Sequence, residues 1–388
     1  MQEKSRDIHF ANEPDLRKVG LNPNFWYPLA VAKNIKKGKV AASSFAGEPI
    51  ALVRTESNQI YALEDRCAHR QMPLSCGIVQ GEKLKCCYHG WLYDEHGQCA
   101  VPYLPEGVPL PHGVRTYPTR IAYGLVFVFP GDPMLADTVP LPDLPEFHSP
   151  SYLTISVSRL VRCHYSFWHE NLMDMNHQFL HRRWMGKFEP PLLAVRKDDS
   201  SVEVDYRFDF PEGSLSVRSL IRNILGFQST KASAAVGSLS DGGEQQTKYD
   251  SDFMTISTHY PYQSLMLRRP SISEPLLKLW VAYVPVDLEQ RVTHTCGVVM
   301  VRRPRIPWLG DLLLRPLHRF FSDVIFEEDQ FALEAEQRAY DQQGADWNQE
   351  ILPFIMDLRH LLIAAGVPAQ SGSPRQTRRL HAEPRFDA

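Results

Sequence analysis

Short apolar runs separated by Gly and Pro dominate the first third of the chain. The runs at residues 49–53, 59–63 and 121–129 have the length of single β-strands and lie between turn-forming residues. Several short strands bounded by turn signals are typical of a small antiparallel sandwich or barrel. We therefore expect an all-β domain over residues 24–135.

A cluster of Pro and Gly breaks this pattern near residue 130. Pro130-Gly131-Asp132-Pro133 and the Pro-rich stretch after it predict a domain boundary. Apolar runs of strand length then resume, and a long helical pattern follows them at residues 312–343. The expected strands are residues 152–161, 201–210, 252–259, 277–286 and 293–302. Strands followed by packed helices predict an α+β domain with an antiparallel sheet over residues 136–367.

Three segments have little apolar content to bury. Residues 1–23 are polar and irregular, which suggests an extended lead-in segment, and residues 368–388 have the composition of a disordered tail. Residues 228–250 are rich in Ser, Ala, Gly and Gln and are expected to form a mobile loop. This loop is either a lid over a site or an insertion without a catalytic role.

Composition and charge narrow the class of protein. A net charge of −3 provides no basic excess for phosphates, which argues against nucleic acid as a partner. The first residues lack the apolar core of a secretory signal, and no apolar run reaches the length of about 18 residues that a membrane span needs. We therefore expect a cytoplasmic protein without a membrane partner. In that reducing compartment, its seven cysteines favour metal ligation or free thiols over disulfides.

Two short motifs in the first domain combine Cys with His. Cys67-Ala68-His69 and Cys86-Cys87-Tyr88-His89 are separated by sixteen residues, and each supplies one thiolate and one imidazole. Zinc in a Cys2His2 site is one interpretation, but zinc sites usually group the Cys pair and the His pair separately. The interleaved order instead lets one iron take both thiolates and the other both imidazoles, as in a Rieske [2Fe-2S] cluster. Spacing favours Cys86 as the second thiolate, with Cys87 as the alternative.

The residues around these motifs agree with a cluster site. Gly77, Gly81 and Gly90 permit tight turns that direct backbone N–H groups at bridging sulfides. Trp91 and Tyr93 are available to cover the cluster on one side. The remaining cysteines are expected to be small buried side chains, namely Cys76, Cys99, Cys163 and Cys296.

A second candidate site lies in residues 170–181, which contain no Pro or Gly and which we interpret as a helix. On a helix, Asp174, His177 and His181 lie within about 60° of one another. Two imidazoles one turn apart can share a metal ion, and the carboxylate can hold the second N–H of the first ring. With a distant carboxylate they would form the facial triad of a non-haem Fe(II) oxygenase. A helix with two surface histidines is the alternative.

Both motifs together make the chain resemble the α (oxygenase) subunit of the Rieske non-haem iron oxygenases, over residues 24–343. The resemblance implies that Cys67, His69, Cys86 and His89 bind the [2Fe-2S] cluster. It also implies that His177, His181 and Asp329 bind a mononuclear Fe(II). Periodicity alone does not decide between Glu328 and Asp329, and the resemblance favours Asp329.

The same resemblance implies an assembly, in which Asp174 links His177 to a cluster histidine, expected to be His89, on a neighbouring subunit of a homotrimer. Two departures from the family pattern are visible. Three residues separate the iron histidines, as in the carbazole-oxygenase-like branch, whereas most members of the family have four. Gln71 stands where many members have Gly. The first departure makes it unsafe to transfer a substrate class from the commoner branches.

The implied activity is that of a mono- or dioxygenase acting on a small-to-medium organic substrate. O2 and two electrons would be consumed, and the product would be hydroxylated, dihydroxylated or dealkylated. The sequence shows no Gly-rich nucleotide motif and no second Cys set, so a separate reductase or ferredoxin must supply the electrons. Two other classes remain open: a Rieske electron-transfer protein with a non-catalytic second domain, and a zinc-stabilised binding module.

Overall fold

The computed structural model describes residues 14–105, 107–182, 191–207, 252–303 and 307–368, with side chains of 307–322 outside the description. The predicted loop at 228–250 and all but the first residue of the predicted tail lie outside the described residues. No helix of the described part is long and apolar enough to cross a membrane.

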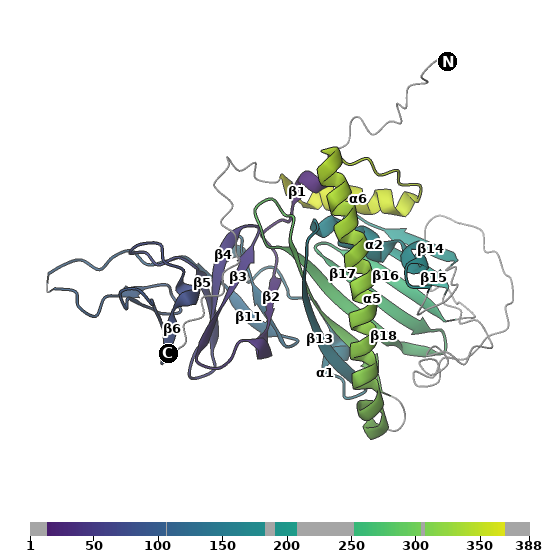
Figure 1. Cartoon of the computed structure of the whole chain (residues 1–388). Helices are drawn as coiled ribbons and strands as arrows, with labels where there is room; N and C mark the ends of the chain where they lie inside the picture. The colour runs from purple at the N-terminus through teal and green to yellow at the C-terminus, as the bar shows by residue number, and fades with distance from the viewer. Residues whose placement is uncertain (1–13, 106, 183–190, 208–251, 304–306, 369–388) are drawn as a thin grey trace, which may run out of the picture.

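The first region is all β, as predicted (Figure 1). One antiparallel sheet has the order β10-β5-β4-β3 and a second has the order β11-β12-β2. These strands are β2 Tyr27–Val31, β3 Lys39–Phe45, β4 Glu48–Arg54, β5 Ile60–Glu64, β10 Thr116–Tyr117, β11 Thr119–Ala122 and β12 Leu125–Val128. Short 3-10 helices, η2 Ala32–Asn34 and η4 Pro133–Leu135, follow β2 and β12.

The apolar run at 121–129 is not the single strand that we expected. Residues Tyr123 and Gly124 adopt positive φ angles of 54° and 71°, which reverses the chain between β11 and β12. Two consecutive residues with positive φ make the tight turn that suits the twist of a hairpin. All four residues of β12 are buried, so the apolar pattern continues through the turn.

A small sheet has the order β6-β7-β8-β9, and the second Cys–His motif, residues 86–89, lies between its strands β7 and β8. Its strands are β6 Ile78–Gln80, β7 Lys83–Lys85, β8 Leu92–Tyr93 and β9 Cys99–Ala100, preceded by the 3-10 helix η3 Leu74–Cys76. A separate apolar core beneath the two Cys–His loops includes Leu63, Leu74 and Leu84.

The second region contains a seven-stranded antiparallel sheet with the order β13-β19-β18-β17-β16-β15-β14. Strands β13 Tyr152–Val161 and β19 Thr293–Arg302 have the predicted bounds. The others are β14 Leu192–Lys197, β15 Ser201–Arg207, β16 Phe253–His259, β17 Tyr262–Arg269 and β18 Ile272–Pro285. The sequence did not predict β14 or β17.

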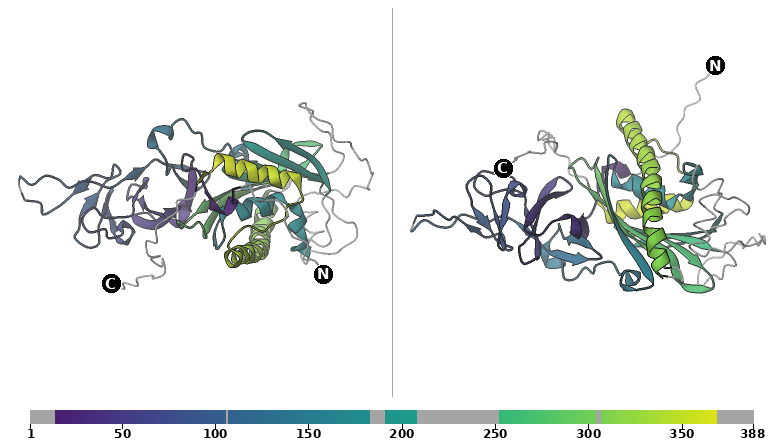
Figure 2. Two further views of the ribbon diagram at one scale, coloured as in Figure 1. Left: turned by 90° about the horizontal axis from the view of Figure 1, so that it is seen from above. Right: turned by 60° about the horizontal axis from the view of Figure 1, so that its bottom comes forward.

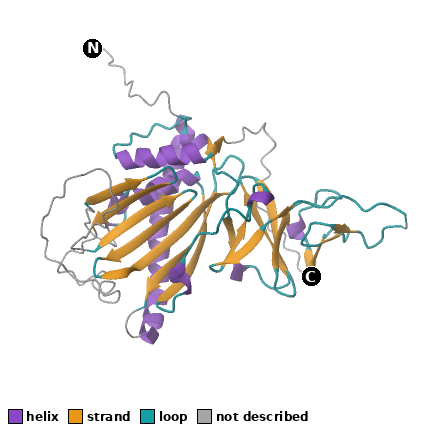
Figure 3. Ribbon diagram, turned by 180° about the vertical axis from the view of Figure 1, so that it is seen from behind, coloured by secondary structure: helices purple, strands orange, loops and turns teal. Residues whose placement is uncertain are grey.

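Helices cover one face of this sheet. The long helix α5 Pro307–Gln343 runs along the sheet, and α2 Tyr165–Met173 packs between them (Figures 1 and 2). Two further helices are α1 Pro145–His148 and α6 Pro353–Ala365. From behind, the strands of the two β-regions lie side by side, with α5 on the far side of the large sheet (Figure 3). Phe127 of β12 contacts Trp280 of β18, with ring centroids 6.0 Å apart, so the two regions share a core.

The two ends of the described chain meet beside α2. The 3-10 helix η1 Leu16–Lys18 leads into β1 Val19–Gly20, which pairs with β20 Val367–Pro368. Arg17 is buried and forms an ion pair with Glu170 of α2. Residues 16–20 of the predicted lead-in segment are therefore part of the folded core.

Candidate metal centres

Two loops bring the predicted thiols and imidazoles together. Cys67 follows β5 and Cys86 follows β7, and each is 2% exposed. His69 and His89 lie further out, half-buried, with their Nδ1 atoms 3.1 Å apart. Burial, with a smaller contribution from the neighbouring Cys67 thiol, raises the pKa of Cys86. Two buried thiols and two less buried imidazoles fit the donor set of a Rieske cluster.

The two Cys–His loops have matching backbone hydrogen bonds and φ angles. Cys67 N–H donates to the Met72 carbonyl and Cys86 N–H to the Trp91 carbonyl, both at 2.8 Å. The fourth residue after each cysteine, Gln71 or Gly90, has a positive φ, of 59° and 72°. Gln71, which stands where many family members have Gly, therefore adopts a backbone conformation that favours Gly.

Aromatic side chains cover both ligand pairs. Trp91 stacks on the His69 ring at 4.6 Å, and its indole N–H donates to the Tyr103 hydroxyl at 2.9 Å. The Tyr93 hydroxyl lies 3.1 Å from the Cys67 thiol and accepts a hydrogen bond from Ala68 N–H. Burial raises the pKa of Tyr93, so its hydroxyl remains a donor for the thiolate.

One expectation about this region is wrong. Cys76 is exposed, whereas Cys99, Cys163 and Cys296 are buried as predicted. The N–H groups of Gly77 and Gly90 donate to the carbonyls of Leu74 and Cys86, so these two amides close turns. Cys87 is exposed, which distinguishes it from the buried Cys86.

The second site joins two distant segments of chain. His177, His181 and Asp329 each offer one ligand atom, and these atoms lie within 4.8 Å of one another. Asp329 Oδ1 is 3.7 Å from His177 Nε2 and 3.2 Å from His181 Nε2. His181 is 1% exposed and Asp329 9%. Two imidazoles and one carboxylate are the donor set of the facial triad that binds non-haem iron.

The histidines do not lie on one continuous helix, contrary to our expectation. Helix α2 ends at Met173, and Asp174 has extended backbone angles of −89° and 92°. The 3-10 helix η5 Met175–Phe179 then begins, capped by the Asp174 carboxylate, which accepts a hydrogen bond from Asn176 N–H. His177 Nδ1 contacts the backbone carbonyl of Asp174 at 2.6 Å. The group that holds the first ring is thus a carbonyl and not the predicted carboxylate.

In both histidine rings Nε2 faces Asp329, because the Nδ1 atom contacts a different partner. His181 Nδ1 contacts Glu328 Oε2 at 2.7 Å, and its buried Nε2 has no hydrogen-bond partner among the described residues. Burial alone would lower the pKa of His181, but the carboxylates of Asp329 and Glu328 outweigh it and raise that pKa. Asn171 Nδ2 also donates to Asp329 Oδ1 at 3.2 Å.

Sequence reasoning missed the roles of Asn171 and Glu328. Asn171 lies three positions before Asp174, in the segment that was expected to form one helix with the histidines. In the sequence, Glu328 was considered only as the alternative to Asp329 for the ligand position.

Aromatic and soft side chains of the second region lie in several different environments. Trp168 is buried and stacks on Tyr283 at 5.5 Å, and the charge of Asp329 adds to burial in raising the pKa of Tyr283. Phe167 and Met254 belong to the main core, and Trp280 contacts the first β-region. Phe179 is 72% exposed.

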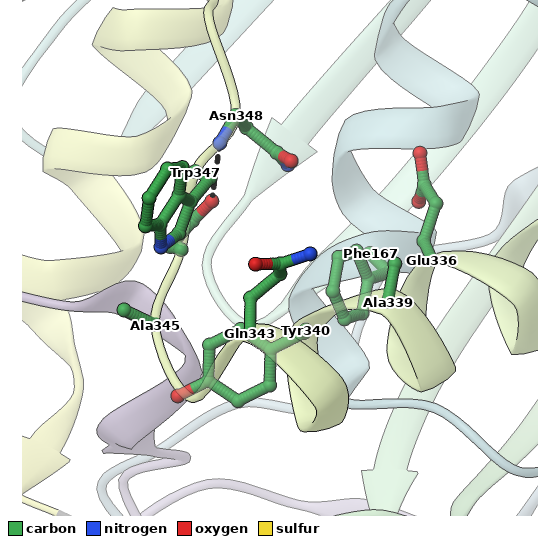
Figure 4. Close-up of a pocket in the computed structure, with 9 residues that line it drawn as sticks. Phe167, Glu336, Ala339, Tyr340, Gln343, Ala345, Trp347 and Asn348 are labelled. Atoms are coloured by element: carbon green, nitrogen blue, oxygen red, sulfur yellow. Dashed lines mark hydrogen bonds between the residues drawn. The ribbon is translucent and has the colours of Figure 1, made fainter. Parts of the chain in front are cut away.

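A cavity of about 100 Å³ lies at the C-terminal end of α5 (Figure 4). Phe167 of α2, Tyr340 and Gln343 of α5, and Trp347 of the following loop line it. None of the three proposed ligands of the mononuclear iron lines this cavity.

Comparisons with known proteins match both regions of the chain. The family model of the Rieske [2Fe-2S] domain matches residues 25–118, and that of the vanillate O-demethylase oxygenase C-terminal domain matches residues 161–353. A 4beta-methylsterol monooxygenase of Methylococcus capsulatus is 30% identical, over 98% of this chain and 100% of the relative. The oxygenase component of dicamba O-demethylase from Stenotrophomonas maltophilia is 36% identical, over 41% of this chain and 47% of the relative. The crystal structure of dicamba monooxygenase bound to dicamba matches with a TM-score of 0.67 and 22% identity, covering 89% of this chain and 98% of that chain.

These matches confirm the resemblance read from the sequence. The chain belongs to the Rieske non-haem iron oxygenases. It is an oxidoreductase whose cofactors are a [2Fe-2S] cluster and a mononuclear iron.

Proposed function

We propose that this oxygenase inserts one oxygen atom into a methyl C–H bond of an organic substrate, with two electrons from a separate reductase or ferredoxin. The overall change is R–CH3 + O2 + 2e⁻ + 2H⁺ → R–CH2OH + H2O. The relative matched over its full length is named a methylsterol monooxygenase, and others are named O-demethylases. Hydroxylation of a methyl carbon is common to both reactions, because a hydroxylated O-methyl group breaks down to an alcohol and formaldehyde.

The convergence of His177, His181 and Asp329 is the observation that carries this proposal. We assign these three residues as ligands of the mononuclear iron, and Cys67, His69, Cys86 and His89 as ligands of the cluster. When bound, the cluster supplies single electrons and the iron activates O2. The protein's own part is to fix the ligand atoms. Each iron imidazole is held at Nδ1, and Asn171 holds the carboxylate.

We further propose that electrons cross between copies of the chain in a homotrimer. The Cys–His loops and the α2–α5 site belong to different regions of one chain (Figure 1). His89 is half-buried in the free chain, and Asp174 is half-buried beside the iron ligands. A contact between His89 of one copy and Asp174 of the next would complete a path to His177. Head-to-tail contacts of this kind close into a ring of three copies if each copy is rotated by a third of a turn from the last.

We propose the cytoplasm as the place of action. All seven cysteines are free, and the thiols of Cys76 and Cys87 are exposed. Exposed free thiols are typical of proteins in a reducing compartment.

Product analysis with ¹⁸O2, a compatible reductase and methyl-bearing substrates tests the reaction. The substrates are a 4-methylsterol, a methoxybenzoate and a methylxanthine. We expect a hydroxymethyl product that carries one labelled oxygen atom, or formaldehyde together with the demethylated substrate. A cis-dihydrodiol as the only product would refute methyl hydroxylation.

Asp329→Ala tests the metal assignment separately. This variant should lose mononuclear iron and activity but keep the cluster spectrum, because the carboxylate is removed from the ligand group only. Glu327→Ala is the matched control, since Glu327 is an exposed carboxylate two positions away on α5. Retention of mononuclear iron in Asp329→Ala would refute the assignment.

A further inference from the structure

We propose that Glu328 is a positioning residue that holds His181 for the mononuclear iron and strengthens its bond to the metal. This inference depends on the ligand set proposed above. Glu328 Oε2 lies 2.7 Å from His181 Nδ1, the ring nitrogen that faces away from the ligand group. A carboxylate on the far nitrogen fixes the tautomer of a ligating imidazole and raises its basicity.

Three consecutive acidic residues on α5 occupy three different environments. Glu327 is exposed, the side chain of Glu328 is 25% exposed, and that of Asp329 is 12% exposed. Successive residues on a helix point about 100° apart, so only one of the three can point directly at the metal. The short Asp329 side chain takes that position. The longer Glu328 side chain reaches around the ring to its other nitrogen.

Helix α5 therefore contacts both nitrogens of one imidazole through adjacent residues. Asp329 Oδ1 lies 3.2 Å from Nε2, and Glu328 Oε2 lies 2.7 Å from Nδ1. The Nε2 atom is buried without a hydrogen bond to the described residues, so it remains available to a metal. This arrangement sets the position of the ring relative to Asp329.

The two histidines are held by groups of different charge. His177 Nδ1 contacts the neutral carbonyl of Asp174, whereas His181 Nδ1 contacts a carboxylate. A charged acceptor makes a stronger hydrogen bond to an N–H group than a neutral one. His181 should therefore be the stronger donor of the two to the iron.

Fe(II) titration of the protein tests this role without turnover. The full-length protein keeps its cluster, is depleted of mononuclear iron, and is titrated anaerobically with Fe(II). We expect Glu328→Ala to weaken binding about 10- to 100-fold, the range for loss of a residue that supports a metal ligand. Glu328→Gln should fall between this variant and the parent, because its amide oxygen still accepts a hydrogen bond without the charge. Glu327→Gln, the matched control, should bind as the parent does.

Two further measurements separate this role from a purely structural one. The melting temperature of the iron-depleted protein and the cluster spectrum should be the same for Glu328→Gln and Glu327→Gln. Equal Fe(II) affinity of Glu328→Ala, Glu328→Gln and the parent would overturn the inference while the ligand set stands. If His181→Ala also binds Fe(II) as the parent does, the proposed ligand set is wrong and the inference falls with it.

Discussion

The carboxylate of Asp174 allows the proposed path between copies to be tested directly. Its Oδ1 accepts hydrogen bonds from the backbone and side-chain N–H groups of Asn176, at 2.9 and 2.7 Å. No hydrogen bond or ion pair joins Oδ2 to another residue that the structure describes. This oxygen is therefore available to an N–H donor such as His89 of a neighbouring copy. In Asp174→Asn the amide keeps one oxygen for Asn176 but presents a donor where the acceptor was.

The expected loss follows from this single contact. A hydrogen bond to a charged group contributes about 1.5–3 kcal/mol, and about 1.4 kcal/mol corresponds to a factor of ten in rate. We therefore expect Asp174→Asn to slow electron transfer from cluster to iron roughly 10- to 100-fold. Iron content should be unchanged, because His177 is held by the backbone carbonyl of residue 174, which the substitution retains.

The assay is a single turnover followed by stopped-flow absorbance. Protein with a reduced cluster is mixed with O2 and substrate, and the decay of the reduced-cluster spectrum is recorded. Asp132→Asn is the matched control, since Asp132 caps the 3-10 helix η4 in the same way and accepts a hydrogen bond from Met134 N–H at 3.0 Å. Decay of Asp174→Asn at the parental rate, with both metals and the oligomer retained, would refute the path.

Three other changes have defined outcomes. Cys86→Ser should lose the Rieske EPR signal and Cys87→Ser should keep it, because only the first thiol is buried beside Cys67; a colourless Cys87→Ser would show the reverse. Arg17→Met should lower the free energy of unfolding by about 3–5 kcal/mol, the range for breaking a buried ion pair, since its side chain is 1% exposed and pairs with Glu170. Because Glu170 also pairs with Arg359 at 3.4 Å, Glu170→Gln has a cost of its own, but this cost should be smaller in Arg17→Met than in the parent; strictly additive losses in urea denaturation would contradict the pairing. Burial lowers the pKa of His169 from 6.5 to about 3, so between these values the unfolded state binds the extra proton, and stability falls by about 1.4 kcal/mol for each unit that the pH is lowered. His169→Phe should therefore show a shallower fall in melting temperature from pH 6.5 to 5, and parallel curves would exclude this origin.

The large sheet was predictable where its strands carry a continuous apolar pattern. Strands β13 and β19 were predicted to the residue, and they pair with each other along their whole length. Strand β17 was missed because its sequence, Tyr-Gln-Ser-Leu-Met-Leu-Arg-Arg, lacks β-branched residues. Its pairing with β16 and β18 on both sides supplies the stability that local preference does not.

Local sequence was sufficient to find the two ligand groups but not their supporting contacts. The Cys–His loops and the two iron histidines are short motifs whose spacing is visible in the sequence. Asp329 lies about 150 residues from the histidines, and its inward stripe on α5 includes the polar Gln337. The apolar residues of α5 therefore do not by themselves mark its buried face. Leu333 and Gln337 are buried with Asp329, and Phe326 is partly buried.

The break at Asp174 explains how one residue can serve two contacts. In an uninterrupted helix, the carbonyl of residue 174 would accept the N–H of residue 178, and the carboxylate would lie on the same surface as the histidines. Because α2 ends at Met173, the carbonyl instead contacts His177 Nδ1, and the carboxylate caps η5 with one oxygen. The main chain of Asp174 thus faces the metal ligand while its second carboxylate oxygen remains free of the described residues. Helix propensity over residues 170–181 opposes such a break, and the capping preference of Asp favours it.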